Sequence, residues 1–496
     1  MPGGFPSSSF SSGFAIWVAT PSVPAPTYSS VSGSYTTLTL QQAMQALADR
    51  LSDTSMIRWV AAELQSHILE SLRTYSALTA TFRDRGVFPT VASQAFYDLP
   101  TVLPALRGYT VTDADLIASL EYSLLEPLSS GASWSGSQQF SLADLVNALT
   151  RRRDQFLRDT GAVVTRILSP VSPPPDGRIP LSQSVISLRR LAWMASGGTY
   201  SPLRRDDAWG IVHYRPRWVQ TPTRPPAVYS VSDTPPLWVQ LAPPPLDAGT
   251  LDLLAIDSLA AVSPIQPALA APLNIPDDWT WVVKFGALAD LFSRDGLAKD
   301  AARAVYCEQR YQDGVERATA APVILSARID DGPAPLHSIA DLDRYLPGWQ
   351  ANLGQPTKVL STGQNLLALS PVPDAAAPMG QYAITVDLVR NAPIPTALNH
   401  FLAIGPELVD ALLDYAQHLA LLKEGAQPLL ESQHLLDRFA RACGVTMNLQ
   451  QASVPARRQL SAQTLQDVAV NPRQQAALPL GTQQDAEAQA VLQGGR

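Results

Sequence analysis

The chain has 496 residues, of which 46% are apolar and only 16% charged, and its formal net charge is −7. Proteins whose main task is to grip nucleic acid carry a surplus of Lys and Arg, so this acidic chain is a poor candidate for that class. Its two cysteines, Cys307 and Cys443, are too few and too far apart for a disulfide framework or a clustered metal site.

Both ends of the chain have the composition of segments without a core of their own. Residues 1–36 are rich in Gly, Ser and Pro and lack the basic start and the apolar core of a secretory signal. Residues 450–496 are rich in Gln and Ala and contain no aromatic side chain. We expect a flexible arm and a tail that become ordered only against a neighbour, in a soluble protein made in a cytoplasm.

Apolar residues recur at helical spacing in the first half of the chain. Thr39 is expected to cap a short helix, and a longer helix is predicted from about Ile57 to Arg83. The apolar stripe of this longer helix consists of Leu64, Ile68, Leu72, Tyr75 and Phe82. Further helices are expected to begin after Thr112 and after Ser141, where Ser-x-x-Asp is typical of a capping box. The pattern predicts a helical domain with short strands.

The second half contains an internal repeat. Two apolar segments, 237–256 and 365–388, each consist of an apolar run, a proline-rich turn, a glycine and a second apolar run. Pro243 recurs 128 positions later as Pro371, and Gly249 recurs 131 positions later as Gly380. Each copy predicts a β-hairpin with a long, stiff loop.

A helical pair is expected after each hairpin. The first helix of the pair begins at Pro276 and ends at Gly296 in one copy, and begins at Gly405 and ends at Gly425 in the other. The two copies agree in order and length while most side chains differ, as expected where packing is preserved. The predicted fold is α+β and mainly helical, with the divisions 1–36 (arm), 37–224 (helical domain), 225–318 (first β/αα module), 319–354 (linker), 355–449 (second β/αα module) and 450–496 (tail).

Motifs of the common enzyme classes are missing from the sequence, which has no phosphate-binding loop, no H-E-x-x-H and no C-x-x-C. His418 and Cys443 could form a Cys–His site, but both cysteines lie on apolar helical stripes, which favours small buried hydrophobes. Asp277 and Asp278 could be an acid–base pair or a cation site, but their place at a predicted helix start favours capping. We therefore expect no enzymatic activity, no cofactor and no metal.

A cluster of basic and aromatic residues stands out between positions 204 and 218. It could stack bases or a sugar ring. It could equally dock against a neighbouring subunit, because Trp, Tyr and Arg are enriched at the energetic centres of protein interfaces. The acidic character of the chain favours subunit contact, and the residues of this candidate interface are Arg204, Arg205, Trp209, Tyr214, Arg217 and Trp218.

The run Asp53–Trp59, followed by Leu72–Thr79, resembles the start of adaptor proteins of tailed bacteriophages. The proline-rich strand segments and the helix that begins at Ile275–Asp278 resemble further parts of such proteins. The resemblance implies a non-enzymatic structural protein of the virion, a head-to-tail connector in the neck. It implies a homo-oligomeric ring of about twelve copies, with a channel through which DNA passes without sequence-specific binding.

The partners that the resemblance implies are the portal protein, the tail tube or nozzle and other copies of the chain, without any membrane. The virion would be assembled in the cytoplasm of a bacterial host. One alternative is another tail component, such as a baseplate or fibre-attachment subunit, which differs in copy number relative to the portal. A second alternative is a β-rich carbohydrate-binding or hydrolytic protein that uses Trp209 and Trp218, which binding to glycans would favour.

Overall fold

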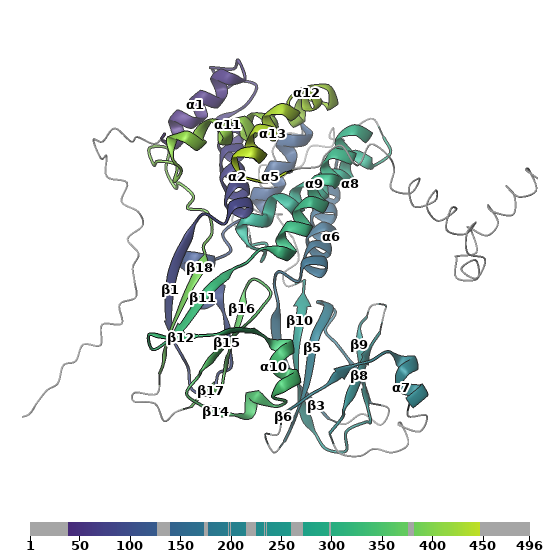
Figure 1. Cartoon of the computed structure of the whole chain (residues 1–496). Helices are drawn as coiled ribbons and strands as arrows, with labels where there is room; N and C mark the ends of the chain where they lie inside the picture. The colour runs from purple at the N-terminus through teal and green to yellow at the C-terminus, as the bar shows by residue number, and fades with distance from the viewer. Residues whose placement is uncertain are drawn as a thin grey trace, which may run out of the picture.

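The computed structural model describes residues 38–125, 139–172, 177–196, 198, 200–214, 225–232, 234, 236–258, 271–296, 299–374 and 381–446. Helices account for 44% and strands for 25% of these residues, so the α+β prediction is confirmed. The long helices gather at one end of the molecule and the strands at the other (Figure 1). The predicted arm, 1–36, and the whole of the predicted tail, 450–496, lie outside the described residues.

Helix starts follow the capping signals in the sequence. Thr39, Thr112 and Ser141 each accept a hydrogen bond from a backbone N–H three residues on, and each bond is reciprocated in a capping box. The helices of the helical end are α1 (Leu40–Arg50), α2 (Ala61–Thr79), α5 (Asp113–Leu124), α6 (Leu142–Thr160), α8 (Thr280–Ser293), α9 (Ala301–Ala320), α11 (Pro406–Leu421), α12 (Ala426–Glu431) and α13 (Gln433–Ala442). The 3₁₀ turns η3 (Asp277–Trp279) and η5 (Leu422–Glu424) adjoin α8 and α11.

The long predicted helix is shorter than expected at both ends. Asp53 accepts hydrogen bonds from the backbone N–H groups of Ile57, Arg58 and Trp59 at 3.1, 2.8 and 2.9 Å. These three residues therefore belong to a loop, and α2 begins at Ala61. At the other end α2 stops at Thr79, and the residues after Phe82 form a strand instead of the last helical turn.

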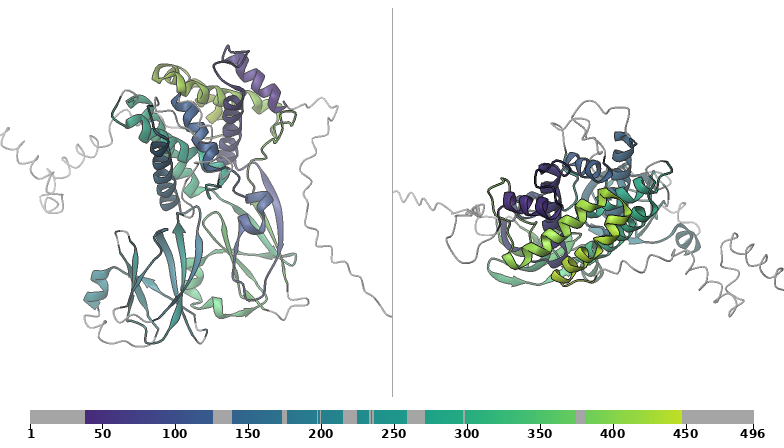
Figure 2. Two further views of the ribbon diagram at one scale, coloured as in Figure 1. Left: turned by 180° about the vertical axis from the view of Figure 1, so that it is seen from behind. Right: turned by 90° about the horizontal axis from the view of Figure 1, so that it is seen from above.

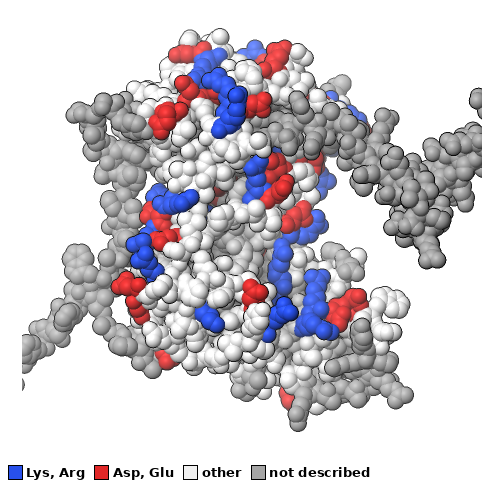
Figure 3. All heavy atoms as spheres, viewed as in Figure 1, with Lys and Arg blue, Asp and Glu red and all other residues white. Residues whose placement is uncertain are grey.

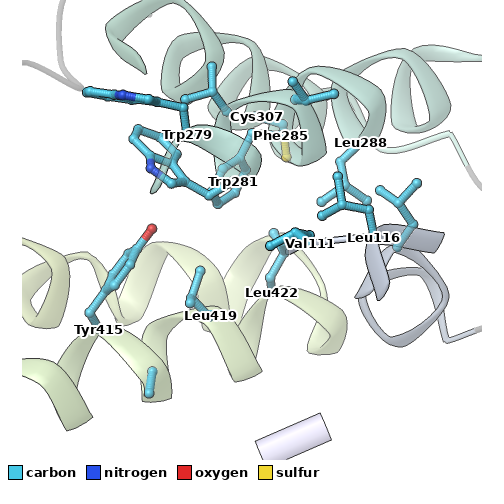
Figure 4. Packing of buried hydrophobic residues seen from close by; sticks show 14 of the residues in the cluster. Val111, Leu116, Trp279, Trp281, Phe285, Leu288, Cys307, Tyr415, Leu419 and Leu422 are labelled. Carbon is cyan, nitrogen blue, oxygen red and sulfur yellow. The ribbon is translucent and has the colours of Figure 1, made fainter. Parts of the chain in front are cut away.

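The helical end encloses one large apolar core, part of which is drawn in Figure 4. Trp281 of α8 and Tyr415 of α11 lie toward one another there. The side chain of Arg310 is fully buried beside them, with its guanidinium 4.8 Å from the Trp281 ring and donating to the Tyr415 hydroxyl at 2.9 Å. Lys284 and Glu70 form a buried ion pair at 2.6 Å. Each of these buried cations thus has a polar partner, which burial of a charge requires.

The described strands between Thr165 and Asp257 form a β-sandwich, which we call sandwich I. Its first sheet, Ia, has the strand order β3-β10-β5-β6, and its second sheet, Ib, has the order β4-β9-β8-β7. The elements are β3 (Thr165–Val171), β4 (Arg178–Pro180), β5 (Val185–Ala195), β6 (Tyr200–Pro202), β7 (Arg204–Arg205), α7 (Ala208–Tyr214), β8 (Val228–Val231), β9 (Trp238–Ala242) and β10 (Gly249–Asp257). Side chains of both sheets, including Trp193 and Val239, share one core.

A second β-sandwich, sandwich II, lies beside the first (Figures 1 and 2). Sheet IIa has the order β1-β18-β11-β12 and sheet IIb the order β13-β15-β16-β2, with a shared core between them. Its elements are β1 (Arg83–Pro89), β2 (Phe96–Asp98), β11 (Ile324–Ile329), β12 (Gly332–Ala334), β13 (Leu336–Ser338), α10 (Ile339–Tyr345), β15 (Lys358–Thr362), β16 (Leu366–Ser370) and β18 (Ala383–Val389). Smaller elements near it are α3 (Leu99–Val102), α4 (Pro104–Arg107), η4 (Trp349–Ala351), β14 (Leu353–Gly354) and β17 (Val372–Pro373).

The two sandwiches have the same strand order and the same pairing. In each, the fifth strand pairs in parallel with the sixth, and a short helix, α7 or α10, separates the two. In each, the third strand has a bulge at the same place in its pairing with the last strand. The peptide bonds before Pro243 and Pro371 are both cis. Sandwich II differs in being interrupted, because all of residues 99–323 lie between its second and third strands.

The helices around the sandwiches correspond as well. Thr39, before α1, forms an isolated bridge with Phe401, and Thr112, before α5, forms one with Pro272. Helices α1, α2, α11 and α13 accompany sandwich II in the chain as α5, α6, α8 and α9 accompany sandwich I. Phe401 follows Pro272 by 129 positions, the same interval that separates the predicted helix ends Gly296 and Gly425.

The predicted β-hairpins are wrong, although their strands exist. Strand β9 pairs with β4 and β8, whereas β10 pairs with β3 and β5. Likewise β16 pairs with β15 and β2, whereas β18 pairs with β1 and β11. Each proline-rich connection therefore crosses from one sheet of a sandwich to the other, since both strands are central and already have two neighbours. Strands β3 to β7, inside the predicted helical domain 37–224, belong to sandwich I.

Candidate functional site

Helix α7 presents the most exposed aromatic side chain among the described residues. Trp209 is 85% exposed and Val212 on the same helix is 50% exposed. On its other side Ile211 is buried against Ala242 and Val228, which anchors the helix to the outer face of sheet Ib. Asp207 accepts a hydrogen bond from the backbone N–H of Gly210 and so fixes the first turn. The helix is therefore held firmly while its apolar side faces outward.

Three of the predicted interface residues lie together at this place. Arg204 and Arg205 form the exposed strand β7 directly before α7, and Trp209 follows on the helix. The guanidinium of Arg204 lies 3.1 Å from the carboxylate of Asp206. The side chain of Tyr214 and all of Arg217 and Trp218 lie outside the described residues.

The side chains considered for Cys–His chemistry are packed in the helical core. Burial raises the pKa of Cys307 well above its usual range and that of Cys443 to about 12. Both thiols are buried and free, as the apolar stripes predicted. Burial and the nearby cation of Arg310 lower the pKa of His418 to about 3, and its ring nitrogens bond the hydroxyls of Tyr306 and Ser432 at 2.7 and 2.8 Å. His418 is thus a neutral, structural side chain.

Asp277 and Asp278 do not cap the helix that they precede. Asp277 accepts hydrogen bonds from the backbone of Thr110 and Val111 at 2.8 and 3.0 Å, which ties the start of α5 to η3. Asp278 accepts from the Ser76 hydroxyl at 2.9 Å and from a backbone N–H after β18 at 3.2 Å. The capping prediction is therefore wrong for these side chains. Both are buried, and each connects segments that are distant in the sequence.

Asp278 also borders a hollow between the helical end and sandwich II. This pocket has a volume of about 230 Å³ and is lined in part by Ser76, Arg107, Trp279 and Arg317. Burial raises the pKa of Asp278 from 3.8 to about 6, although the cation of Arg107 opposes the shift. Both oxygens of this carboxyl already accept hydrogen bonds from the chain itself. The pocket therefore has a structural carboxyl at its border.

Among the described residues no group of three or more His, Cys, Asp or Glu could hold a metal ion.

The contact between the sandwiches is centred on Asp252 of β10. Its side chain is fully buried on the outer face of sheet Ia. It accepts hydrogen bonds from Arg166 at 2.8 and 3.2 Å, from the Tyr200 hydroxyl at 2.8 Å, and from Gln350 at 3.0 Å. Gln350 belongs to η4 of sandwich II, so the carboxylate is shared between the sandwiches. The guanidinium of Arg166 in turn lies 4.6 Å from the ring of Phe96 on sheet IIb.

Helix α10 forms the second part of this contact. Arg190 of β5 donates to Asp343 of α10 at 2.8 Å, and the indole N–H of Trp349 donates to the same carboxylate at 2.9 Å. Apolar side chains fill the space between the sheets, with Leu254 of sheet Ia packed among residues of sheet IIb and α10. The members of this cluster are Ala95, Phe96, Val164, Leu254, Ile339, Leu342, Trp349, Leu360, Leu366, Ala368 and Val372.

This contact joins two sheets that do not correspond to one another. Sheet IIb of sandwich II corresponds to Ib of sandwich I, but it packs against Ia. The outer faces of Ib and IIa meet no further described sheet. Sequence reasoning missed Asp252 and Asp343, although one signal was present. A single Asp in the apolar run Leu251–Ile256 indicates a buried carboxylate with a polar partner.

Protein-family models give no match to the chain, and a comparison with curated proteins finds no match either. Among the helices that the structure describes, none combines the length and the apolar character needed to cross a membrane.

Proposed function

We propose that this chain is a non-enzymatic structural subunit of a tailed-phage virion, and that it forms the connector ring between portal and tail. The observation that carries the proposal is the unlike pairing of sheets inside the chain. Sheet IIb packs against Ia. The counterpart of Ia is IIa and the counterpart of IIb is Ib, and the outer faces of IIa and Ib meet no further described sheet. One chain therefore has sheet IIa, the counterpart of Ia, at one end of its pair of sandwiches and sheet Ib, the counterpart of IIb, at the other.

A contact between unlike faces differs from a two-fold contact in what it builds. A two-fold contact uses the same patch on both partners and ends with a dimer. A head-to-tail contact leaves a free face on each side, and it closes into a ring when the successive rotations complete a circle. Repetition of the IIb–Ia arrangement between copies gives such a series. This geometry supports a ring subunit over a monomeric enzyme or binding protein.

The proposal includes a finer description of the fold. We take the chain as two copies of one unit, in which two helices precede an eight-stranded sandwich and further helices follow it. The second copy is inserted between β2 and β11 of the first. The matching strand order, the matching bulges and the bridges of Thr39 and Thr112 support this description. Packing is preserved between the copies while side chains differ, which suits a building block.

Two further features support the proposal. The region that resembles phage adaptors, Asp53–Thr79, is a loop followed by a long helix in the structure. On the face drawn in Figure 3, Lys and Arg lie among Asp and Glu over the described part of the surface. A mixed surface on an acidic chain suits a channel that DNA passes without being held. The portal, the tail tube or nozzle and other copies of the chain are the proposed partners.

The test is to find the chain in purified virions and to locate it by electron microscopy. We expect a ring coaxial with the portal, in a copy number that matches the portal's symmetry. Density at the distal tail, or a copy number set by the fibres, would instead assign the chain to a baseplate or fibre attachment. Absence from the virion, or a turnover abolished by one polar substitution, would overturn the proposal.

A further inference from the structure

We infer that the outer face of sheet Ib, together with α7, is a docking surface for sheet IIa of a second copy of this chain. The contact would repeat between copies the arrangement that sheet IIb, with α10, makes on sheet Ia inside one chain. This inference rests on the proposed ring and adds which surfaces form it. The surface of α7 is the part of the predicted interface that the structure describes, with Trp209 85% exposed.

The correspondence between α7 and α10 fixes where each side chain would lie. Asp207 bonds the first turn of α7 as Ser338 bonds the first turn of α10, and the two residues are 131 positions apart. Four positions further on, Ile211 and Leu342 are both buried on the outer face of their own sheet. The next residue is Val212 in α7 and Asp343 in α10.

The receiving sheets correspond in the same way. In sheet Ia, Leu191 and Arg190 of β5 stand opposite Leu253 and Leu254. In sheet IIa, Ala327 and Ser326 stand opposite Val386 and Asp387 at the matching positions next to the bulge. Ser326 therefore occupies the place of Arg190, and its bulged neighbour Leu325 occupies the place of Arg189.

Both members of the ionic pair change together. Inside the chain, Asp343 of α10 meets Arg190 of sheet Ia at 2.8 Å. On the available faces, Val212 replaces the acid, and Ser326 replaces the base with Leu325 beside it. An unpaired charge in a buried contact costs several kcal/mol, so losing only one member would make the arrangement unfavourable. Loss of both members removes this ion pair without leaving either charge unpaired, while Asp387 and Arg85 on sheet IIa are paired with each other at 2.8 Å.

The outer faces of sheets Ib and IIa also differ in composition from the internal contact. In the internal contact, Leu360 and Ala368 of sheet IIb face sandwich I. Ser230 and Gln240 occupy the matching positions of sheet Ib but are buried, so the exposed apolar side chains on this side are Trp209 and Val212 of α7. On the opposite partner, Val87 and Leu325 of sheet IIa are 41% and 37% exposed. Interfaces that form between already folded partners are more polar than internal ones and contain a few apolar anchors.

The first experiment joins the two faces covalently. The full chain with Val212→Cys and Leu325→Cys, treated with a short bismaleimide under conditions in which wild type forms rings, is expected to give a ladder of linked copies. Each single variant is expected to give at most linked dimers. As a matched control, Val212→Cys is combined with Leu430→Cys, which is 52% exposed at the helical end and is expected to give no ladder. Wild type, in which both native cysteines are buried, shows the background level of linkage.

The second experiment exchanges the charges. Val212→Asp alone is expected to weaken assembly at least tenfold, measured as the concentration at which rings form in analytical ultracentrifugation. Ser326→Arg alone is expected to weaken it as well. The double variant recreates the Asp343–Arg190 pair of the internal contact and is expected to recover assembly to within about threefold of wild type. Circular dichroism should show each variant folded, because Val212 is exposed and Ser326 is partly exposed on the outer face of sheet IIa.

The outcomes separate this inference from the proposed function. Rings that form normally with Val212→Asp and give no ladder between the two cysteines would overturn this docking surface and leave the connector proposal intact. A chain found in virions as solitary copies would overturn the connector proposal and this surface together. Specific glycan binding abolished by Trp209→Ala, with assembly unchanged, would assign α7 to sugar recognition and also overturn the docking surface.

Discussion

Helices α7 and α10 occupy the same place in two sandwiches of the same topology, yet their surroundings differ. Helix α10 lies against both sandwiches, with Asp343 bound to Arg190 and Leu342 buried between sheets. Among the described residues, helix α7 packs against sheet Ib alone, and Trp209 and Val212 are exposed. The difference shows that the same local fold can form an internal contact in one sandwich and an exposed surface in the other, depending on a few side chains.

The largest expected effect comes from breaking the internal joint. Asp252→Ala removes the buried acceptor of Arg166, Tyr200 and Gln350, and we expect a loss of about 3–5 kcal/mol in the free energy of unfolding. The matched control is Asp387→Ala on sheet IIa, whose partner Arg85 is 54% exposed. That change is expected to cost about 0–1 kcal/mol. Urea unfolding checks both, and equal losses would contradict the difference between the two faces.

Apolar truncation of the two helices should give a smaller contrast. Leu342→Ala opens a cavity among residues from both sandwiches and is expected to cost about 3 kcal/mol. Ile211→Ala affects only the contact of α7 with sheet Ib, and we expect about 1–2 kcal/mol because this site is more easily relaxed. Thermal unfolding of the two variants measures the contrast. A greater loss for Ile211→Ala would show that α7 is the more deeply packed helix.

The halves also differ in the carboxyl at the start of their main helix, where Asp278 is buried and Glu407, 129 positions later, is exposed. Burial raises the pKa of Asp278 from 3.8 to about 6. Between these values the folded state holds a proton that the unfolded state has released, so this group's contribution to stability is lost as pH rises through the window.

We therefore expect Asp278→Asn to gain stability relative to wild type as pH rises from 4 to 7, by about 2–3 kcal/mol. Denaturant unfolding at several pH values measures this difference. Glu407→Gln serves as the control, and its difference from wild type is expected to stay within about 0.5 kcal/mol over the same range. A difference for Asp278→Asn that does not change with pH would show that the carboxyl is already ionised at pH 4.

The smallest effect on the isolated chain is expected at the outer surface itself. Trp209→Ala removes a side chain that is 85% exposed, so the free energy of unfolding should change by less than about 0.5 kcal/mol. A melting temperature that falls by several degrees would mean that this ring supports the fold of sandwich I.

Local signals in the sequence predicted local structure well. The capping residues Thr39, Thr112 and Ser141 begin their helices as expected, and Cys307 and Cys443 are buried. The start of α2 could not be predicted in this way, because it depends on the hydrogen bonds that Asp53 accepts in the preceding loop. Signals that act within a few residues could thus be read without the structure.

Strand pairing could not be predicted in the same way. Strands β9 and β10 are buried on both faces for most of their length, so an apolar run gives no indication of which sheet each joins. The partner of β18 is β1, about three hundred residues earlier, and no local pattern encodes that distance. The interface residues Asp252 and Arg190 bond Gln350 and Asp343 of sandwich II, which lie 98 and 153 residues away, so their roles emerged only from the structure.

The interruption of sandwich II has a consequence for synthesis of the chain. Strands β1 and β2 leave the ribosome first, but β11 and β18, which pair with them or complete their core, follow after residues 99–323. At roughly 5–20 residues per second, that delay lasts on the order of 10–50 s. Sandwich I is contiguous and is complete before β11 emerges. During translation, sandwich I can therefore fold while β1 and β2 still lack their partner strands. The unpaired edges of β1 and β2 need protection until those partners have been synthesised.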